Sequence, residues 1–238
     1  MLFIQDDSCP EEYYSIEIKD GETVITAKGE KGKYYAQLTL DQLYEMGKVP
    51  LCKIIDLPAY SYRGFMIDSA RHMQSVDEIK AYITAAARFK FNTFHWHLCD
   101  DQGYRIESEK YPKLNEVGSY RNGHGFRSKN PARYGGYYTK EQIKDIVAFC
   151  KEKHIEVIPE IDMPGHSSAL IASYPYLSCR GEQINVMTDG GIFKDILCAG
   201  KEEVFEFCFN LLDEIAELFP GEYVHLGGDE APKARWCN

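Results

Sequence analysis

Hydrophobic and polar positions alternate in two short stretches near the start of the chain. Residues 14–19 and 22–27 have the alternation of half-buried strands, and Asp20-Gly21 between them is typical of a hairpin turn. Residues 34–46 instead place apolar side chains at helical spacing. The pattern predicts two paired strands and a helix, which together form a small α+β domain over residues 1–57.

The pattern changes after residue 57, where short apolar runs alternate with helical stretches. The expected strands are residues 64–68, 92–97, 155–161 and 223–228. The expected helices between them are residues 75–89, 139–154 and 201–218. Repeated strand–helix units favour parallel strands that are joined by right-handed crossovers. Residues 58–238 are therefore predicted to form an α/β domain.

Ionisable side chains collect where the expected strands end. They are Asp68 after the first strand, Asp100 and Asp101 after the second, Glu160, Asp162 and His166 after the third, and Asp229 and Glu230 after the fourth. In a (β/α) barrel, the loops that follow the strands build the active site at one face. Polar groups at the same end of four successive strands predict such an active site rather than an ordinary solvated surface.

Two glycines precede the last acidic pair. In a regular strand, neighbouring side chains point to opposite faces, so Asp229 and Glu230 could reach one substrate only if the backbone turned. Gly227 and Gly228 permit that turn, because glycine adopts backbone angles that are closed to other residues. The stretch predicts two adjacent carboxylates with different roles at the mouth of a strand. Taken alone, it would suit an acidic turn after an edge strand equally well.

A pair of histidines lies within the second expected strand. His95 and His97 are two residues apart, so both rings face the same side of the sheet, and Trp96 faces the core on the other side. Such a pair holds a divalent metal in some barrel hydrolases. No other strand supplies a clear set of metal ligands, which favours buried, hydrogen-bonded histidines over a metal-dependent hydrolase.

The composition is that of an ordinary soluble protein, with 44% hydrophobic and 27% charged residues among 238. The net charge of −10 and the absence of a Lys/Arg run argue against a protein that coats nucleic-acid phosphates. No apolar run of about 18 residues exists, and the first residues lack the basic start of a secretory signal. We therefore expect a cytoplasmic protein that contacts neither membranes nor nucleic acid.

Cysteine spacing offers no metal site. The eight cysteines form no CxxC pair and no compact zinc-binding spacing, and several lie in apolar runs. They are predicted to be buried free thiols; they are Cys9, Cys52, Cys99, Cys150, Cys179, Cys198, Cys208 and Cys237.

Four motifs together resemble the substrate-assisted β-N-acetylhexosaminidases of glycoside hydrolase family 20. They are residues 63–72 (RGFMIDSARH), 92–102 (NTFHWHLCDDQ), 160–166 (EIDMPGH) and 225–230 (HLGGDE), in this order. The resemblance covers residues 58–238. It implies the first four βα units of a (β/α)8 TIM barrel, preceded by part of a small α+β domain.

The resemblance also implies a reaction, the retaining hydrolysis of terminal non-reducing N-acetyl-D-hexosamine residues. The 2-acetamido oxygen of the substrate would attack the anomeric carbon and give an oxazolinium intermediate, so no enzyme nucleophile is needed. By the motif match, Glu230 would protonate the glycosidic oxygen and then deprotonate water, while Asp229 would orient the acetamido group. No metal or other cofactor is implied.

Four further residues receive roles by the same match. Arg63 would hold sugar hydroxyls, although a salt bridge at the start of a strand is the alternative. Asp100, Asp162 and His166 would line or support the pocket, either in direct contact with the sugar or through hydrogen bonds to the residues that touch it. The expected partners are N-acetylhexosamine-containing glycans or oligosaccharides.

The family barrel has eight strands, and only four are expected here. Three interpretations follow: a fragment of a longer hexosaminidase, one half of a split enzyme that associates with a separate C-terminal half, or a non-catalytic relic that binds sugar. Half a barrel would expose two strand edges and apolar surface, which favours pairing with another chain. The isolated chain is expected to have little or no activity.

Overall fold

The computed structural model describes residues 1–47 and 49–236 and divides into two compact units. The first comprises Met1–Arg63 and Thr84–Asn92, and the second comprises Gly64–Ile83 and Thr93–Asn238. The sequence instead suggested a single division after residue 57. Residues 84–92 belong with the first unit because Lys90 Nζ binds Asp56 Oδ2 at 2.7 Å and Asn92 Nδ2 donates to the Ser61 carbonyl at 2.6 Å. No helix in the described part of the chain is long and apolar enough to span a membrane.

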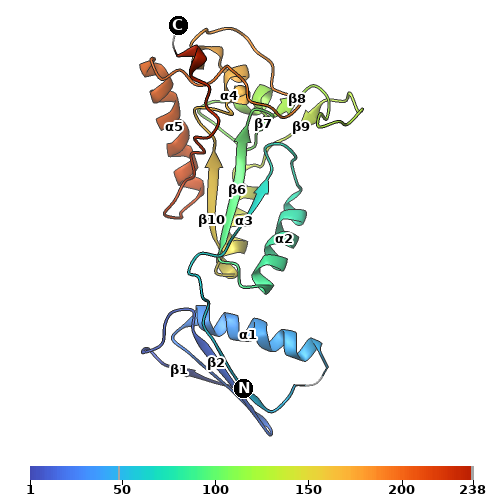
Figure 1. The fold of residues 1–238 in the computed structure, drawn as a ribbon, viewed down its shortest axis with the longest axis vertical. Coiled ribbons are helices and arrows are strands. Elements are labelled where there is room, and N and C mark those ends of the chain that lie inside the picture. Colours follow the sequence, from blue (N-terminus) through green and yellow to red (C-terminus); the bar gives the residue numbers. More distant parts are fainter. Residues whose placement is uncertain (48, 237–238) are drawn as a thin grey trace. The chain divides into compact units, whose positions relative to one another are not determined.

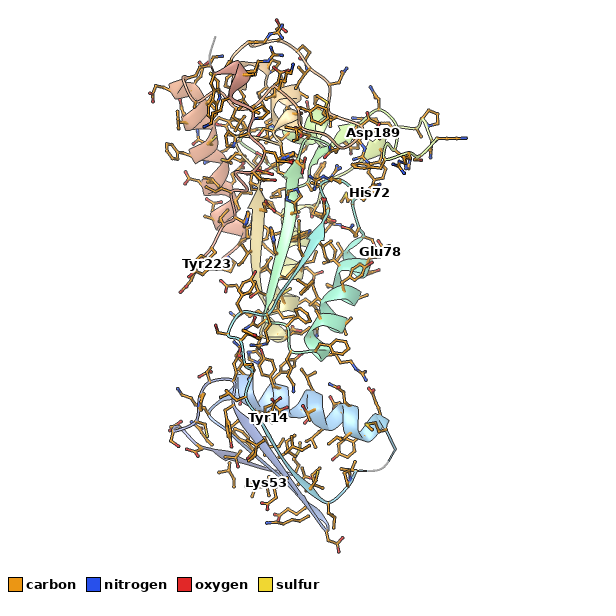
Figure 2. The ribbon with its side chains drawn as sticks, viewed as in Figure 1. Tyr14, Lys53, His72, Glu78, Asp189 and Tyr223 are labelled. Carbon is orange, nitrogen blue, oxygen red and sulfur yellow. The ribbon has the colours of Figure 1, made fainter. Side chains whose placement is uncertain are left out.

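The first unit is a four-stranded sheet covered by one helix (Figure 1). Its strands lie in the order β1 (Leu2–Gln5), β3 (Glu22–Ala27), β2 (Tyr14–Lys19) and β4 (Cys52–Asp56), and the helix is α1 (Glu30–Glu45). The predicted hairpin is confirmed, with Gly21 at φ +75° in its turn. Tyr14, Ile16 and Leu40 are buried between the sheet and the helix (Figure 2 labels Tyr14).

The second unit is built on a parallel sheet in the order β10-β6-β5. Its strands are β5 (Gly64–Asp68), β6 (Thr93–Asp100) and β10 (Glu156–Ile161). The helices that follow the strands are α2 (Val76–Arg88), whose residues from Thr84 onward fall in the first unit, α3 (Lys140–Glu152) and α5 (Glu202–Leu218). These elements lie within a few residues of the predicted ranges. The start of α3 is fixed by a reciprocal capping box between Thr139 and Gln142.

The fourth expected strand, residues 223–228, is reduced to a single parallel bridge between His225 and Glu160. Its backbone still follows β10, since the amide of His225 donates to Pro159 and the carbonyls of His225 and Leu226 accept from Ile161 and Met163. The ladder ends there because Gly227 and Gly228 take φ values of +65° and +93°, which turn the chain out of the extended conformation.

A long segment joins β6 to α3 at the carboxyl end of the sheet, the end toward which the arrows point in Figure 1. It contains β7 (Gly103–Tyr104), the π-helical turn η1 (Leu114–Gly118), β8 (Tyr120–Arg121) and β9 (Tyr134–Gly135). The fully buried Arg105 organises it, because its guanidinium donates to five backbone carbonyls, those of Ser69, Ala70, Gln102, Ser119 and Gly136. Burial lowers the pKa of Arg105 to about 10, which leaves it charged at neutral pH.

Three short helices complete the second unit. They are α4 (Ser168–Ser173) and η2 (Pro175–Leu177) after β10, and η3 (Lys233–Arg235) after the acidic pair.

Candidate active site

Charged side chains meet at the carboxyl ends of β5, β6 and β10. One carboxylate oxygen, Glu160 Oε2, lies 2.6 Å from both His95 Nε2 and His97 Nδ1. The other ring nitrogen of His97 lies 2.9 Å from Asp100 Oδ2. Asp100 in turn is 2.6 Å from a guanidinium nitrogen of Arg71. Negative and positive groups therefore alternate in a buried row that runs from Glu160 through His97 and Asp100 to Arg71.

Hydrogen bonding decides the charge states in this row. Burial alone would lower the pKa of His97, but the bonds to Asp100 and Glu160 raise it to about 10, so the ring is cationic at neutral pH. Burial opposes ionisation of Glu160, yet the hydrogen bonds from His95 and His97 hold the pKa of this carboxyl far below its usual range. The pKa of Asp100 is likewise far below normal, because His166, His97 and Arg71 outweigh burial.

His166 connects the buried acids to the exposed acidic pair. Its Nδ1 lies 3.0 Å from Asp101 Oδ2 and 3.4 Å from Asp100 Oδ1, and these bonds raise the pKa of His166 to about 11. Its Nε2 lies 3.3 Å from Glu230 Oε2 and 3.8 Å from Asp229 Oδ2. No hydrogen bond is formed at this distance, so Nε2 is a buried ring nitrogen without a hydrogen-bond partner among the described residues.

The acidic pair sits on the predicted turn. Gly227, Gly228 and Glu230 all have positive φ, and Glu230 is at +44°, which is uncommon for a residue with a side chain. A Cβ atom on Gly227 would lie 1.9 Å from Asp162 Oδ1, so only glycine fits there. The side chains of Asp229 and Glu230 are 64% and 51% exposed. The turn thus presents two neighbouring carboxylates to solvent above the buried row.

Asp162 lies directly beneath this turn. It is buried, and its Oδ1 accepts a hydrogen bond of 3.2 Å from the backbone amide of Gly228. Burial and the nearby carboxylates of Asp229 and Glu160 raise the pKa of Asp162 to about 7, although the Gly228 bond acts in the opposite sense. Asp162 is therefore a carboxyl group that exchanges its proton near neutral pH.

Five of the six residues selected from the sequence come together here, namely Asp100, Asp162, His166, Asp229 and Glu230. Arg63 does not, because it belongs to the first unit and precedes β5 at its amino end. Its guanidinium is 2.8 Å from Glu12 Oε2 and also donates to the carbonyls of Tyr60 and Lys90. Arg63 thus forms the salt bridge at a strand start that the sequence left as the alternative.

The arginine at the site is Arg71, which sequence reasoning missed. It follows β5 at the carboxyl end, where its Nη1 lies 2.7 Å from Asp68 and its Nη2 2.6 Å from Asp100. Strand direction alone could have selected it, since it comes three residues after Asp68 within the same motif. Glu160 was noted only as one of several acids, and its contacts with both histidines depend on the register between β6 and β10.

The prediction that both histidine rings face the same side of the sheet is confirmed, since both contact one oxygen of Glu160. Trp96 is fully buried in the core, also as predicted. Among the described residues, three groups bring ligand atoms within 4.8 Å of one another: His95, Glu160 and His225; Asp100, Asp101 and His166; and Asp162, His166 and Asp229. His166 belongs to two of them, and its hydrogen bonds to Asp100 and Asp101 raise its pKa to about 11, so a cation would have to displace its proton at neutral pH. In the first group, Glu160 Oε2 already contacts both His95 and His97.

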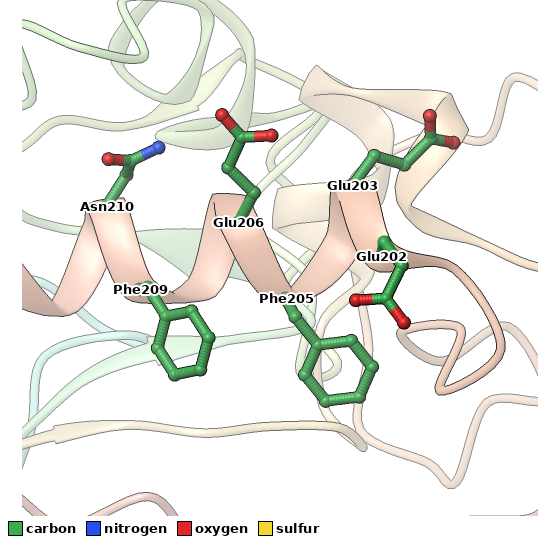
Figure 3. Close-up of a pocket in the computed structure, with 6 residues that line it drawn as sticks. All are labelled: Glu202, Glu203, Phe205, Glu206, Phe209 and Asn210. Carbon is green, nitrogen blue, oxygen red and sulfur yellow. The ribbon is translucent and has the colours of Figure 1, made fainter.

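A separate groove runs along the outer face of α5. Figure 3 shows Phe205 and Phe209 on one side of the helix and Glu203, Glu206 and Asn210 on the other. Both phenylalanines are exposed. The acids that line the groove, Glu202, Glu203 and Glu206, are all exposed, and the groove has no buried titratable group, so we do not take it for the catalytic site.

Comparison with known proteins places this arrangement in a family. The model of glycosyl hydrolase family 20, catalytic domain, matches residues 60–238. A beta-hexosaminidase of Porphyromonas gingivalis is 44% identical over 95% of this chain and 30% of its own length. A beta-hexosaminidase of Akkermansia muciniphila is 41% identical over 89% of this chain and 44% of its own length. The chain thus spans less than half the length of these two relatives.

Solved structures agree with the sequence match. A crystal structure of a beta-N-acetylhexosaminidase superposes with a TM-score of 0.93 at 36% identity, over 99% of this chain and 50% of that one. An exo beta-N-acetylglucosaminidase from Vibrio harveyi, in complex with N-acetylglucosamine, gives a TM-score of 0.85 at 35% identity, over 99% of this chain and 38% of that one. With its acidic pair on a glycine turn above a buried row of charges, this chain belongs to glycosyl hydrolase family 20.

Proposed function

We propose that this chain carries the acid–base machinery of a β-N-acetylhexosaminidase that removes terminal non-reducing N-acetyl-D-hexosamine residues from glycans or oligosaccharides. The observation that supports this most directly is the pair Asp229 and Glu230 on the glycine turn, with His166 Nε2 3.3 Å from Glu230. The N-acetylglucosamine bound to the Vibrio harveyi relative agrees with this class of substrate.

In the proposed reaction the substrate supplies its own nucleophile. Glu230 gives a proton to the departing glycosidic oxygen while the 2-acetamido oxygen attacks the anomeric carbon and forms an oxazolinium ion. Asp229 accepts a hydrogen bond from the acetamido N–H, which orients this group and stabilises the positive charge that develops on it. Glu230 then takes a proton from the water that opens the ring, and the anomeric configuration is retained.

The buried row holds these two groups in position. His166 is anchored by Asp100 and Asp101 and directs its free N–H toward Glu230. Because its pKa is about 11, it keeps that proton throughout the cycle and acts as a fixed positive donor rather than as a base. Asp162 supports the turn from below through the amide of Gly228.

Arg71 takes the role that the sequence gave to Arg63. Its guanidinium is held on two sides by Asp68 and Asp100 and remains one third exposed at the carboxyl end of β5. A planar guanidinium with remaining N–H groups directed to solvent suits neighbouring hydroxyl oxygens on a sugar.

We further propose that these βα units are the first half of a (β/α)8 barrel. The parallel order of β5, β6 and β10, the bridge at His225 and the limited share of each relative that is matched support this. The open edge at His225 and the exposed Phe205 and Phe209 of α5 offer surface for the following βα unit, in the same polypeptide or in a partner. Tyr223, 61% exposed, lies at this edge (Figure 2).

The first test is hydrolysis of a chromogenic N-acetyl-β-glucosaminide by the purified chain, with its mass in solution measured on the same sample. We expect a monomer to show no hydrolysis, because activity requires the second half of the barrel. Turnover by a monomer would contradict the half-barrel proposal. Binding of N-acetylglucosamine without turnover in a completed barrel would favour the sugar-binding alternative.

The second test assigns the acid. In whichever protein containing this chain is active, Glu230→Gln should lower kcat by about 10² to 10⁴ on substrates with poor leaving groups, because general-acid help is lost. Glu222→Gln is the matched control, since Glu222 lies in the same unit ahead of the bridge at His225. Full activity of the Glu230 variant would rule out its role.

A further inference from the structure

Two cysteines outside the catalytic cluster lie in direct contact. Cys179 Sγ and Cys198 Sγ are 2.8 Å apart. A disulfide bond is about 2.05 Å long, so the two sulfur atoms need to approach by less than about 1 Å. No other pair among the described cysteines has its sulfur atoms in hydrogen-bond contact, and Cys237 lies outside the described residues.

The backbone around the pair keeps the two thiols together. Ser178 and Leu197, the residues that precede them, form an antiparallel bridge. The amide of Cys198 donates to the carbonyl of Leu177 at 2.8 Å, and the amide of Leu197 donates to that of Pro164 at 2.9 Å. The sulfur contact is therefore set by a hydrogen-bonded frame and does not depend on rotamers alone.

The segment between the cysteines, residues 180–197, reaches the candidate active site. It has little regular structure of its own, and the amide of Met187 donates to the carbonyl of Asp101 at 3.0 Å. At its far end, Asp195 binds Arg235 Nε at 3.0 Å and the Leu197 carbonyl accepts from Trp236 Nε1 at 2.9 Å. Both partners lie just beyond Glu230, so this segment touches the support of His166 and the chain that follows the acidic pair.

We propose that Cys179 and Cys198 form a disulfide bond that closes residues 180–197 into a loop beside the active site. The oxidant is a small-molecule disulfide such as glutathione disulfide. One cysteine thiolate attacks it and releases one glutathione thiol, and the second cysteine then displaces the other glutathione from the mixed disulfide. Two protein thiols are oxidised, and one glutathione disulfide is reduced to two glutathione molecules.

Closure of this loop removes freedom from the unfolded chain, and it also holds Met187 and Leu197 against their partners in the folded one. Burial raises the pKa of the Cys179 thiol to about 11, so little thiolate is present at neutral pH and exchange in the folded protein is slow. Both cysteines are free thiols in this structure, as the sequence predicts, and the inference concerns their oxidised form; it is independent of the proposed function.

The direct test is peptide mapping. The chain is incubated for a day in a glutathione redox buffer, alkylated without reduction, digested and analysed by mass spectrometry. We expect Cys179 and Cys198 in one cross-linked species, about 2 Da lighter than the sum of the two thiol peptides, and Cys150 alkylated after denaturation. Alkylation of both Cys179 and Cys198 in the oxidised sample would overturn the proposal.

The structural effect is measured on the same protein. Reduction, Cys179→Ser and Cys198→Ser should each lower the melting temperature of the oxidised chain by about 5 to 10 °C, and reductant should have no further effect on the variants. Cys150→Ser is the control, because Cys150 is buried in α3 without a sulfur partner, and this variant should keep its response to reductant. Equal melting temperatures for the oxidised and reduced wild type would contradict the loop-closing role.

Discussion

The two units of this chain differ in how deeply their charged side chains are buried. In the first, Tyr14, Ile16, Ile25 and Leu40 form an apolar core, and the ion pairs lie around it with access to water, as Glu12 does at 14% exposure. In the second, Asp100 and Glu160 are carried into the interior at 0% and 6% exposure beside a cationic His97. An apolar core stabilises a fold at no electrostatic cost, whereas buried ion pairs repay their desolvation only with good geometry.

This difference in the burial of charge indicates which unit contains the candidate active site. Buried charges that follow the strands of a parallel sheet on the side of its carboxyl ends are expensive, and they position His166 and Arg71 at the candidate active site. The charges of the first unit have no such role, since Arg63 and Glu12 pair with each other within that unit. The predictions below test this contrast.

The largest expected effect on stability comes from the buried row. Glu160→Gln removes the negative charge that both His95 and His97 contact at 2.6 Å, and His97 then stays buried as a cation with Asp100 alone. We expect a loss of about 3 to 5 kcal/mol in the free energy of unfolding, measured by urea titration and Trp96 fluorescence. Trp96 reports this unit because it is buried between Phe94 and Tyr138.

The matched change in the first unit is Glu12→Gln. Hydrogen bonds from Arg63 and Lys31 overcome burial and lower the pKa of Glu12 to about 2, so it too is ionised and paired. Because water reaches these groups, we expect the free energy of unfolding to fall by only about 1 kcal/mol. Hydrogen exchange of the β2 amides measures this change. Equal costs for the two variants would remove the contrast between the units.

The next effect separates the two arginines of one motif. Arg71→Lys keeps the charge but loses the planar fork that Asp68 and Asp100 hold, so kcat/KM should fall about 10- to 100-fold in an active protein containing this chain. Arg63→Lys should change kcat/KM by less than about threefold and instead weaken the pairing with Glu12. The reverse order, with Arg63 the more sensitive, would restore the assignment made from the sequence.

These arginines also mark the limit of sequence reasoning. Periodicity located β5, β6, β10 and the helices between them, because their apolar spacing is strong, and the glycine pair predicted the turn at Gly227. It did not separate Arg63 from Arg71, although their places before and after β5 distinguish them. It could not detect the partner of Arg63 or the contact between Cys179 and Cys198, because both depend on which distant residues the fold brings near. Residues 223–228 were assigned to a full strand because apolar content does not reveal where a ladder loses its partner.

The last effect is a pH dependence that belongs to Asp162. Its pKa rises from 3.8 to about 7 in the folded chain, so between these values the folded state holds a proton that the unfolded state has lost. Its contribution to stability is therefore fully present below pH 4 and declines by about 1.4 kcal/mol per pH unit until pH 7. Asp162→Asn, which cannot titrate, should lack this part of the slope.

The measurement is the difference in unfolding free energy between wild type and Asp162→Asn at pH 5, 6 and 7. Titrating groups that do not interact with Asp162 cancel in this difference, which therefore reports Asp162 together with its coupling to Asp229, His166 and Glu160. We expect the unfolding free energy of the wild type to fall steadily relative to that of the variant as the pH rises, because Asp162 then ionises beside Asp229 and Glu160. A constant difference would mean that Asp162 is already ionised at pH 5, and the charge beneath the acidic pair would then be fixed rather than exchangeable.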